Sequence, residues 1–245
     1  MNLAETTQQA TAEAAPARVS VIMPVLNEEA RIVTALERLA TVASIHEVIV
    51  VDGGSTDGTV DLVAGAAGAK LLHAPRGRAR QMNAGAHAAS GDVLLFLHAD
   101  VTLPIDAVAH MTRALADPVV VAGAFRTWTV ADDGERRRWS PLLHLADLRS
   151  RYSGLPYGDQ ALFVRAAVFR AVGGFPDQPL MEDLEVSRRL RALGAVRTVP
   201  ASVRVSGRRF LARPIYFTLL VNLLPLLYRL GVPARVLSGF YGHPR

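Results

Sequence analysis

Four short apolar runs alternate with helical patterns over the first hundred residues of the chain. The runs cover 18–24, 48–51, 70–73 and 93–97, and the segments between them carry apolar residues at helical spacing or polar, glycine-bearing turns. Strands that are connected through helices enter one sheet by right-handed crossovers, so neighbouring strands run parallel. The alternation therefore predicts an α/β fold in which helices flank a mainly parallel central sheet.

The second half of the chain is expected to be less regular. Asn27 is expected to cap the first helix, and a later helix is predicted from Pro104 to about Ala116. Further predictions are a strand over 119–125, a charged turn over 132–138, a helical stretch to Tyr152, a strand over 161–164 and a helix over 180–193. No internal repeat or clean linker divides these elements, which favours one domain.

Composition distinguishes three segments. Residues 1–17 are rich in Ala, Thr and Gln and lack a basic start followed by an apolar core, so we expect a disordered leader rather than a signal peptide. Residues 18–210 form the predicted domain, and 211–245 form an apolar helical extension of it. The missing signal pattern favours a cytoplasmic protein.

The overall composition limits the chemistry. The chain has no cysteine, so a metal ion would be held by oxygen or imidazole ligands, which favours Mg²⁺ or Mn²⁺ over structural zinc. The net charge of +5 suits an anionic partner such as a nucleoside diphosphate or an acidic membrane surface. Nucleic acid is disfavoured, because the basic clusters lack interleaved aromatic residues.

Polar residues follow two of the predicted strands directly. Asp52 ends the second run, and His98, Ala99 and Asp100 follow the fourth. Ligands of open α/β sheets gather outside the carboxyl ends of the strands. Asp100 could therefore anchor a divalent cation that bridges two phosphates, and Asp52 could accept hydrogen bonds from a base or a ribose. The alternatives are a helix cap for Asp100 and a turn cap for Asp52.

Two further groups of charged residues could take part in chemistry. Glu182 and Asp183 open a predicted helix, where they could supply a general base or merely complement the helix dipole. The arginine clusters could neutralise a diphosphate or form a solvated basic face. They consist of Arg76, Arg78 and Arg80, and of Arg204, Arg208 and Arg209.

A stretch near the C-terminus is strongly apolar. Residues 215–228 carry no charge, and Arg213 and Arg229 flank them. Fourteen residues fall short of the roughly 20 that are needed to span a bilayer. Peripheral membrane contact through 214–229 and a buried or homodimer-interface helix remain open as interpretations.

Taken in order, these motifs resemble family 2 inverting glycosyltransferases. The resemblance spans roughly 19–193 and rests on 19–24 with Asn27 and Glu28, on 50–59, on Gly77 with 83–85, on 89–92, on 96–100, and on Glu182 with Asp183. Residues 97–100, 157–160 and 206–209 look most similar to a bacterial subgroup found near radical-SAM and selenium-related genes.

The resemblance implies a GT-A fold and sugar transfer from a nucleoside diphosphate donor, with a UDP-sugar favoured. It implies Asp183 as the catalytic base and Asp100 as a ligand of Mg²⁺ or Mn²⁺. The positions that match donor-nucleotide contacts are Pro24, Asn27, Glu28, Asp52, Gly54, Arg76, Gly77, Asn83 and Ala99. Further site candidates are His98, Gln160, Glu182, Arg208 and Arg209.

One position departs from the family pattern, because His98 stands where the Asp-x-Asp metal motif has its first aspartate. The acceptor is not specified, although the apolar C-terminal stretch suggests a lipid-linked one. Two alternatives are a nucleotidyltransferase acting on a sugar phosphate and a non-catalytic protein that binds sugar nucleotides. The first would need a basic, glycine-rich loop after the first strand, where this chain has the acidic stretch 24–28.

Overall fold

The computed structural model describes residues 17–130, 147, 155–208 and 213–241. The charged turn predicted over 132–138, the helical stretch to Tyr152, Arg209 and all but the last residue of the leader lie outside the described residues.

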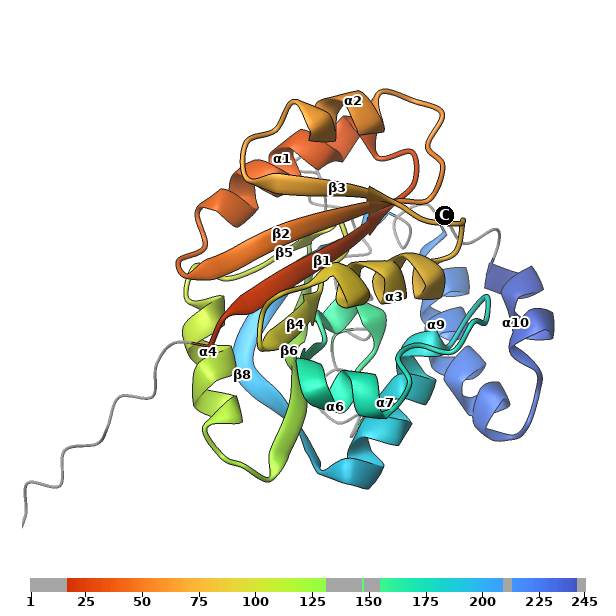
Figure 1. Cartoon of the computed structure of the whole chain (residues 1–245). Coiled ribbons are helices and arrows are strands. Elements are labelled where there is room, and N and C mark those ends of the chain that lie inside the picture. The colour runs from red at the N-terminus through yellow and green to blue at the C-terminus, as the bar shows by residue number, and fades with distance from the viewer. Residues whose placement is uncertain (1–16, 131–146, 148–154, 209–212, 242–245) are drawn as a thin grey trace, which may run out of the picture.

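The described part of the chain contains one eight-stranded sheet of order β3-β2-β1-β4-β7-β6-β8-β5 (Figure 1). The strands are β1 (Val19–Val25), β2 (Ile45–Asp52), β3 (Ala69–His73), β4 (Val93–Phe96), β5 (Val101–Thr102), β6 (Val120–Val130), β7 (Phe163–Arg165) and β8 (Ala195–Ser206). Parallel pairing joins β1 to β2 and β4, β2 to β3, and β6 to β8. Only β7 and β5 pair antiparallel with their neighbours in this sheet of described residues, so the mainly parallel sheet is confirmed.

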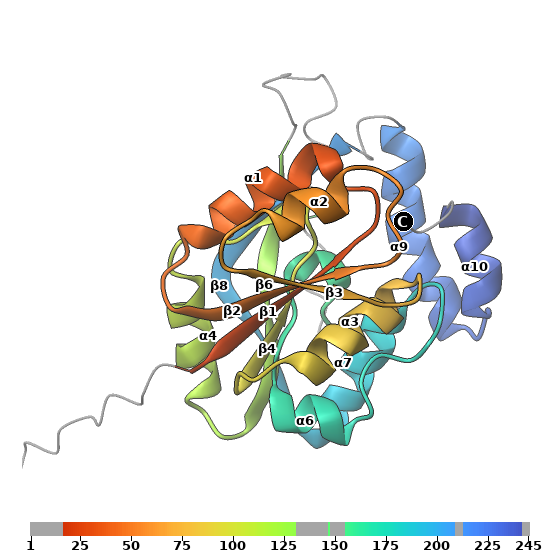
Figure 2. The ribbon, with the colours of Figure 1, turned by 45° about the horizontal axis from the view of Figure 1, so that its top comes forward.

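Helices cover both faces of the sheet (Figure 2). They are α1 (Glu29–Ala40), α2 (Thr59–Ala64), α3 (Arg78–Ala88), α4 (Ala107–Leu115), α6 (Ala166–Ala171) and α7 (Glu182–Leu193). Side chains at alternate positions of β1 point to opposite faces. Val21 and Met23 accordingly pack with α1, α2 and α4, whereas Ile22 packs with α3, α6 and α7.

The first helix begins differently from the expectation. Glu28 precedes α1 at the cap position, and its side chain makes no capping hydrogen bond. Asn27 instead has a positive φ of 54°, a conformation that Asn tolerates better than most residues. Its Oδ1 accepts a hydrogen bond from the Thr56 N–H at 2.8 Å. The predicted cap is therefore wrong, and Asn27 ties the start of α1 to the loop after β2.

The strand β8 was not expected from the sequence. It carries Pro200, which lacks the N–H that a central strand normally donates. The pairing with β6 shifts register between Ala124 and Arg126, whose partners on β8 are Thr198 and Ser202. Pro200 thus lies within the irregular part of the ladder, where a missing donor costs no regular hydrogen bond.

Two helices follow the sheet near the C-terminus. They are α9 (Pro214–Arg229), which matches the predicted apolar stretch, and α10 (Ala234–Tyr241). Leu220, Leu224 and Leu237 pack in a separate cluster with Leu180 and Leu184, next to the start of α7. A search of the described residues finds no helix with the length and apolar character needed to cross a membrane.

Candidate active site

A cavity of about 190 Å³ opens where β1 and β4 end. Six residues predicted for the site line it: Pro24, Glu28, His98, Ala99, Asp100 and Asp183. Further walls come from Arg78 and Gln81 of α3, from Tyr157, Gly158 and Asp159, from Leu180 and Met181, from Val205 and Ser206, and from Val221, Leu224 and Pro225 of α9. The fold therefore brings the candidate base, the candidate metal ligand and the end of the first strand to one hollow.

Two backbone groups hold the Asp183 carboxylate at the cavity wall. The N–H of Gly158 donates to Oδ2 at 2.5 Å, and the N–H of Leu184 donates to Oδ1 at 2.7 Å. Gly158 belongs to a short 3-10 helix, η2 (Gly158–Gln160). A Cβ atom on Gly158 would stand 3.2 Å from both Asp183 Oδ2 and His98 Nε2. Asp183 and His98 thus approach the same point, and the missing side chain of Gly158 leaves room there.

Glu182 forms a buried ion pair with Arg78. The guanidinium Nη2 lies 2.6 Å from Oε1, and the Glu182 side chain is 2% exposed. Among the described residues, Glu182 Oε2 has no hydrogen-bond partner. Burial raises the pKa of Glu182, the nearby Asp183 charge raises it further, and Arg78 opposes both. The pair joins the start of α3 to the start of α7, and Arg78 contributes a positive charge to the cavity wall.

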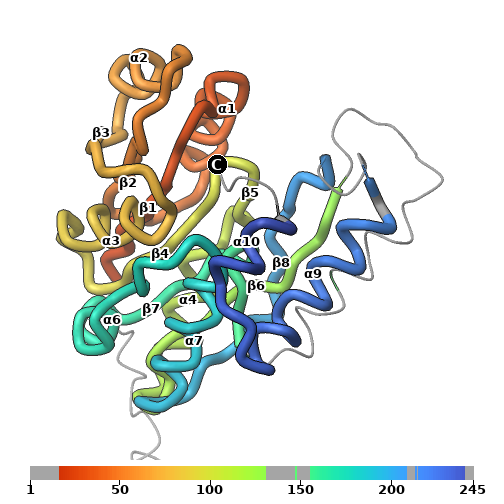
Figure 3. Tube along the Cα trace, turned by 90° about the vertical axis from the view of Figure 1, so that its right-hand side faces the viewer, coloured from red at the N-terminus to blue at the C-terminus, as the bar shows by residue number. Residues whose placement is uncertain are grey.

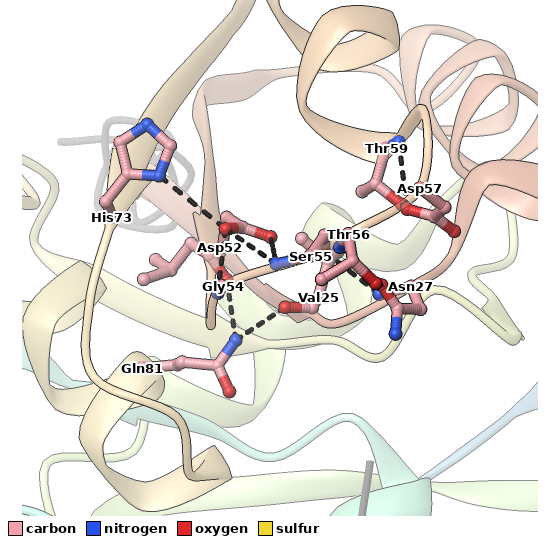
Figure 4. Close-up of polar contacts among 11 residues, drawn as sticks. Val25, Asn27, Asp52, Gly54, Ser55, Thr56, Asp57, Thr59, His73 and Gln81 are labelled. Atoms are coloured by element: carbon pink, nitrogen blue, oxygen red, sulfur yellow. Dashed lines mark hydrogen bonds and ion pairs between the residues drawn. The ribbon is translucent and has the colours of Figure 1, made fainter.

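Asp52 organises the loop that follows β2 (Figure 4). It accepts hydrogen bonds from the N–H of Gly54 at 2.8 Å and of Ser55 at 3.1 Å, and His73 Nδ1 lies 3.6 Å from Oδ2. Burial alone would raise the pKa of Asp52, but hydrogen bonds from Ser55, Gly54 and His73 together hold it below its ordinary value. Asp52 therefore caps this turn as an ionised group, as one of its two interpretations predicted.

The same loop connects the starts of α1 and α2. Asp57 accepts hydrogen bonds from the N–H of Glu29 at 3.2 Å and from the N–H of Thr59 at 3.1 Å. The Glu29 side chain returns the contact by accepting from the N–H of Gly58 at 3.1 Å. These reciprocal bonds fix the loop at the mouth of β1 and β2.

Sequence reasoning missed Gln81, a buried residue of α3 that reaches the ends of two strands. Its Nε2 donates to the carbonyl of Val25 at 2.7 Å and to that of Val51 at 2.8 Å (Figure 4). The sequence gives one hint of this role, because Gln81 is a polar amide among the otherwise apolar or small residues that α3 buries. Gln81 ties α3 to the carboxyl ends of β1 and β2, where the chain leaves the sheet for the cavity.

Several predicted site residues do not line the cavity. Asn83 bonds both backbone groups of Phe175, at 2.8 and 2.9 Å, and thereby holds the Gly-Gly-Phe turn. Gln160 accepts from the N–H of Tyr157 and donates to the carbonyl of Phe125, which fixes η2. Six more predicted site residues lie outside the cavity lining: Asn27, Asp52, Gly54, Arg76, Gly77 and Arg208.

The cavity offers few groups that could hold a metal ion. Asp100 supplies an exposed carboxylate and His98 a half-buried imidazole. Within the described ranges, no three His, Asp or Glu side chains come together as a ligand set. Mg²⁺ and Mn²⁺ often take only one or two protein carboxylates and complete their coordination with phosphate oxygens and water. The donor set fits an ion bound together with a diphosphate, and it does not form a closed protein cage.

Comparison with known proteins identifies the family. The pattern of glycosyl transferase family 2 matches residues 20–173, which include β1, the loop after β2 and the segment around Asp100. The chain belongs to glycosyl transferase family 2.

The family 2 chain is also similar to named relatives. It is 28% identical over 160 residues to an undecaprenyl-phosphate 4-deoxy-4-formamido-L-arabinose transferase of Serratia proteamaculans, which covers 61% of this chain and 48% of the relative. The transferase of the same name from Pseudomonas aeruginosa is 31% identical, with 60% and 46% covered. The chain thus spans about half the length of the curated relatives it matches.

Solved structures confirm the GT-A fold of this family 2 member. The mannosyltransferase PcManGT from Pyrobaculum calidifontis, solved with GDP-Man and Mn²⁺, aligns with a TM-score of 0.66 at 21% identity and covers 92% of this chain and 69% of its own. TarS from S. aureus, solved with UDP-GlcNAc, aligns at 0.61 and 19% identity, with 77% and 58% covered.

Proposed function

We propose that this family 2 chain is an inverting glycosyltransferase in which Asp183 acts as the general base. The observation that carries the proposal is the position of Asp183, whose carboxylate faces the cavity and is oriented by the N–H groups of Gly158 and Leu184. An oriented carboxylate near an acceptor hydroxyl is what general base catalysis requires.

The chain's own groups account for the proton and the leaving charge. Asp183 accepts the proton of the acceptor hydroxyl while that oxygen attacks the anomeric carbon from the side opposite the diphosphate. The bond to the diphosphate breaks in the same step, and a single displacement inverts the anomeric centre. Arg78 is the cavity-lining guanidinium among the described residues, and it favours the negative charge that develops on the leaving group.

Donor binding is assigned to the first half of the sheet. Pro24, Glu28 and Ala99 line the cavity. Asp52 and Gly54 set the loop beside this edge, with Asn27 bonded to the same loop and Gly77 leading into α3. We infer a UDP-sugar as donor. Thermal stabilisation by a panel of UDP- and GDP-sugars measures this preference directly.

Asp100, with His98 two residues before it, would hold Mg²⁺ or Mn²⁺. When bound with the donor, such an ion stabilises charge on the diphosphate. The Mn²⁺ complex of the similar mannosyltransferase supports this assignment. Asp100→Asn and chelation by EDTA should each weaken donor binding, and Asp106→Asn, which changes an exposed carboxylate outside the cavity lining, serves as the matched control. Donor affinity that is unchanged by EDTA would contradict the assignment.

We further infer a lipid-linked acceptor, a cytoplasmic location at the inner face of the membrane, and the radical-SAM/selenium-associated subgroup. The names of the relatives support the acceptor, since they transfer to undecaprenyl phosphate.

Those names also favour a second candidate function, in which the acceptor group is a phosphate rather than a hydroxyl. A phosphate oxygen is largely ionised near neutral pH, so its attack requires no general base.

Asp183→Asn separates the two candidates. With a hydroxyl acceptor, turnover should fall by about 10²- to 10⁴-fold while the donor Kd stays within about twofold, because the variant keeps the shape of the side chain and loses the base. With a phosphate acceptor, turnover should change little. Glycosyl transfer and donor binding are measured on the same preparation, so a folding defect is recognised by loss of both.

A further inference from the structure

The two C-terminal helices both carry exposed apolar side chains, which we together call the C-terminal apolar face. It consists of Leu219, Leu223, Leu226, Leu230, Val236 and Phe240, whose side chains are 48 to 74% exposed. The first three recur four and three residues apart and therefore share one side of α9, and Leu230 follows at the end of that helix. The Tyr216 hydroxyl donates to the carbonyl of Phe240 at 2.6 Å, so α9 and α10 lie side by side (Figure 3).

The opposite side of α9 belongs to the active site. Leu220 and Leu224 are buried against the cluster that includes Leu180 at the start of α7. Val221, Leu224 and Pro225 also line the cavity that holds Asp183. One helix thus separates the catalytic cavity from the C-terminal apolar face.

Charge is distributed very unevenly along the chain. All 22 acidic residues precede Val186, and the 60 residues from Val186 to the end contain eleven arginines. Arg213 and Arg229 bracket α9, Arg235 lies in the first turn of α10, and all three are exposed. Within the described ranges, none of these three guanidinium groups makes an ion pair. An apolar face whose own helices carry arginines and no acidic residue attracts an anionic surface.

We propose that the C-terminal apolar face docks on an anionic phospholipid bilayer, with α9 and α10 lying in the interface and their arginines at the lipid headgroups. Helices with an apolar face and a basic border bind in this way without spanning the membrane. A second copy fits less well, because pairing two such faces would bring their arginines together. The docking does not depend on the proposed function, whereas delivery of a lipid-linked acceptor past α9 into the cavity rests on it.

Vesicle binding tests the docking directly. The full chain is mixed with vesicles of phosphatidylcholine and phosphatidylglycerol, or of phosphatidylcholine alone, and the bound fraction is measured by sedimentation. We expect binding to the anionic vesicles at least tenfold stronger than to the neutral ones, since each arginine near such a surface adds to the electrostatic attraction. Added salt should weaken it by screening the arginines.

Two variants separate the apolar contribution from the basic one. Leu219→Glu places a charge on the C-terminal apolar face and should weaken binding roughly tenfold or more. Its matched control is Val119→Glu. Val119 is equally exposed at 64%, but it lies just before β6, at the end of the sheet where the parallel strands begin and away from the cavity. Joint replacement of Arg213, Arg229 and Arg235 by Gln should remove the preference for anionic vesicles.

Each alternative outcome overturns the docking. Equal binding to neutral and anionic vesicles contradicts the role of the arginines, and a Leu219→Glu variant that binds like the native chain contradicts the role of the apolar face. Absence of vesicle binding together with a dimer in sedimentation equilibrium, dissociated by Leu219→Glu, assigns the face to a second copy. Far-ultraviolet circular dichroism confirms folding of each variant. Donor-sugar binding without vesicles tests the proposed function separately.

Discussion

The two sides of the cavity are built in different ways. On the donor side, Asp52 bonds residues two and three positions ahead of it, and Asn27 and Asp57 link the turns after β1 and β2, across 29 and 28 residues of sequence. On the side of Asp183, the decisive contacts join residues far apart in sequence, as between Arg78 and Glu182. The bonds of Asp52 can form as soon as the loop after β2 forms, and those of Asn27 and Asp57 need only the adjoining turn after β1. The Arg78–Glu182 pair exists only when α3 and α7 have come together. We therefore expect substitutions on the two sides to differ in kind.

The largest expected effect is on the long-range side. Arg78→Met leaves the buried Glu182 without its cation, and breaking such a pair typically lowers the free energy of unfolding by about 3–5 kcal/mol. Because the pKa of Glu182 is raised in the folded protein, the folded state binds that proton more tightly than the unfolded chain does. The loss should therefore be smaller at low pH, and urea unfolding at several pH values measures it.

Arg80→Met is the matched control for that substitution. Arg80 lies two residues further along α3, and its pair with Asp177 is exposed on both sides. Exposed pairs contribute little because water screens them, so the melting temperature should not change measurably. Equal destabilisation by both variants would show that the buried Arg78–Glu182 pair contributes no more to stability than the exposed Arg80–Asp177 pair.

An intermediate effect is expected at Gly158, and it should fall on activity. Gly158→Ala places a Cβ 3.2 Å from Asp183 Oδ2 and from His98 Nε2, which is tighter than most such contacts. A small displacement of a reacting group can reduce turnover on the order of 10²-fold. We expect kcat to fall by up to that factor with little change in melting temperature. A variant with native kcat would show that Asp183 tolerates displacement.

The smallest effect is expected on the local side. Asp52→Asn keeps the size of the side chain but removes the charge that Gly54 and Ser55 stabilise, at a cost of about 1–2 kcal/mol. The pKa of Asp52 is lowered on folding, so its contribution is complete above the ordinary carboxyl pKa and is lost as pH falls through the lower folded-state value. The variant should therefore show a flatter loss of stability in acid than the native chain.

The contrast between the two sides also explains what the sequence could predict. The parallel sheet, the loop at Asp52 and the cavity position of Asp100 follow from runs and turns of a few residues, whereas the place of Asp183 in the site was implied only by the family resemblance. The Arg78–Glu182 pair and the strand β8 depend on partners brought together by the whole fold, and no local pattern marks them. For Asn27 the local prediction was wrong: its side chain suits a helix cap, but it accepts a hydrogen bond from the loop after β2 instead.

The reversed strand β7 has a consequence for how the cavity is enclosed. Because β7 runs antiparallel to β4 and β6, its amino end lies at the edge where those strands have their carboxyl ends. The residues that enter β7, among them Gly158, therefore reach the cavity from the opposite chain direction. The N–H of Gly158 can therefore donate to the Asp183 carboxylate, which would otherwise be hydrogen-bonded by water on that side. The reversed direction of β7 thus gives the cavity a wall of backbone donors at the end of the sheet where the parallel strands finish.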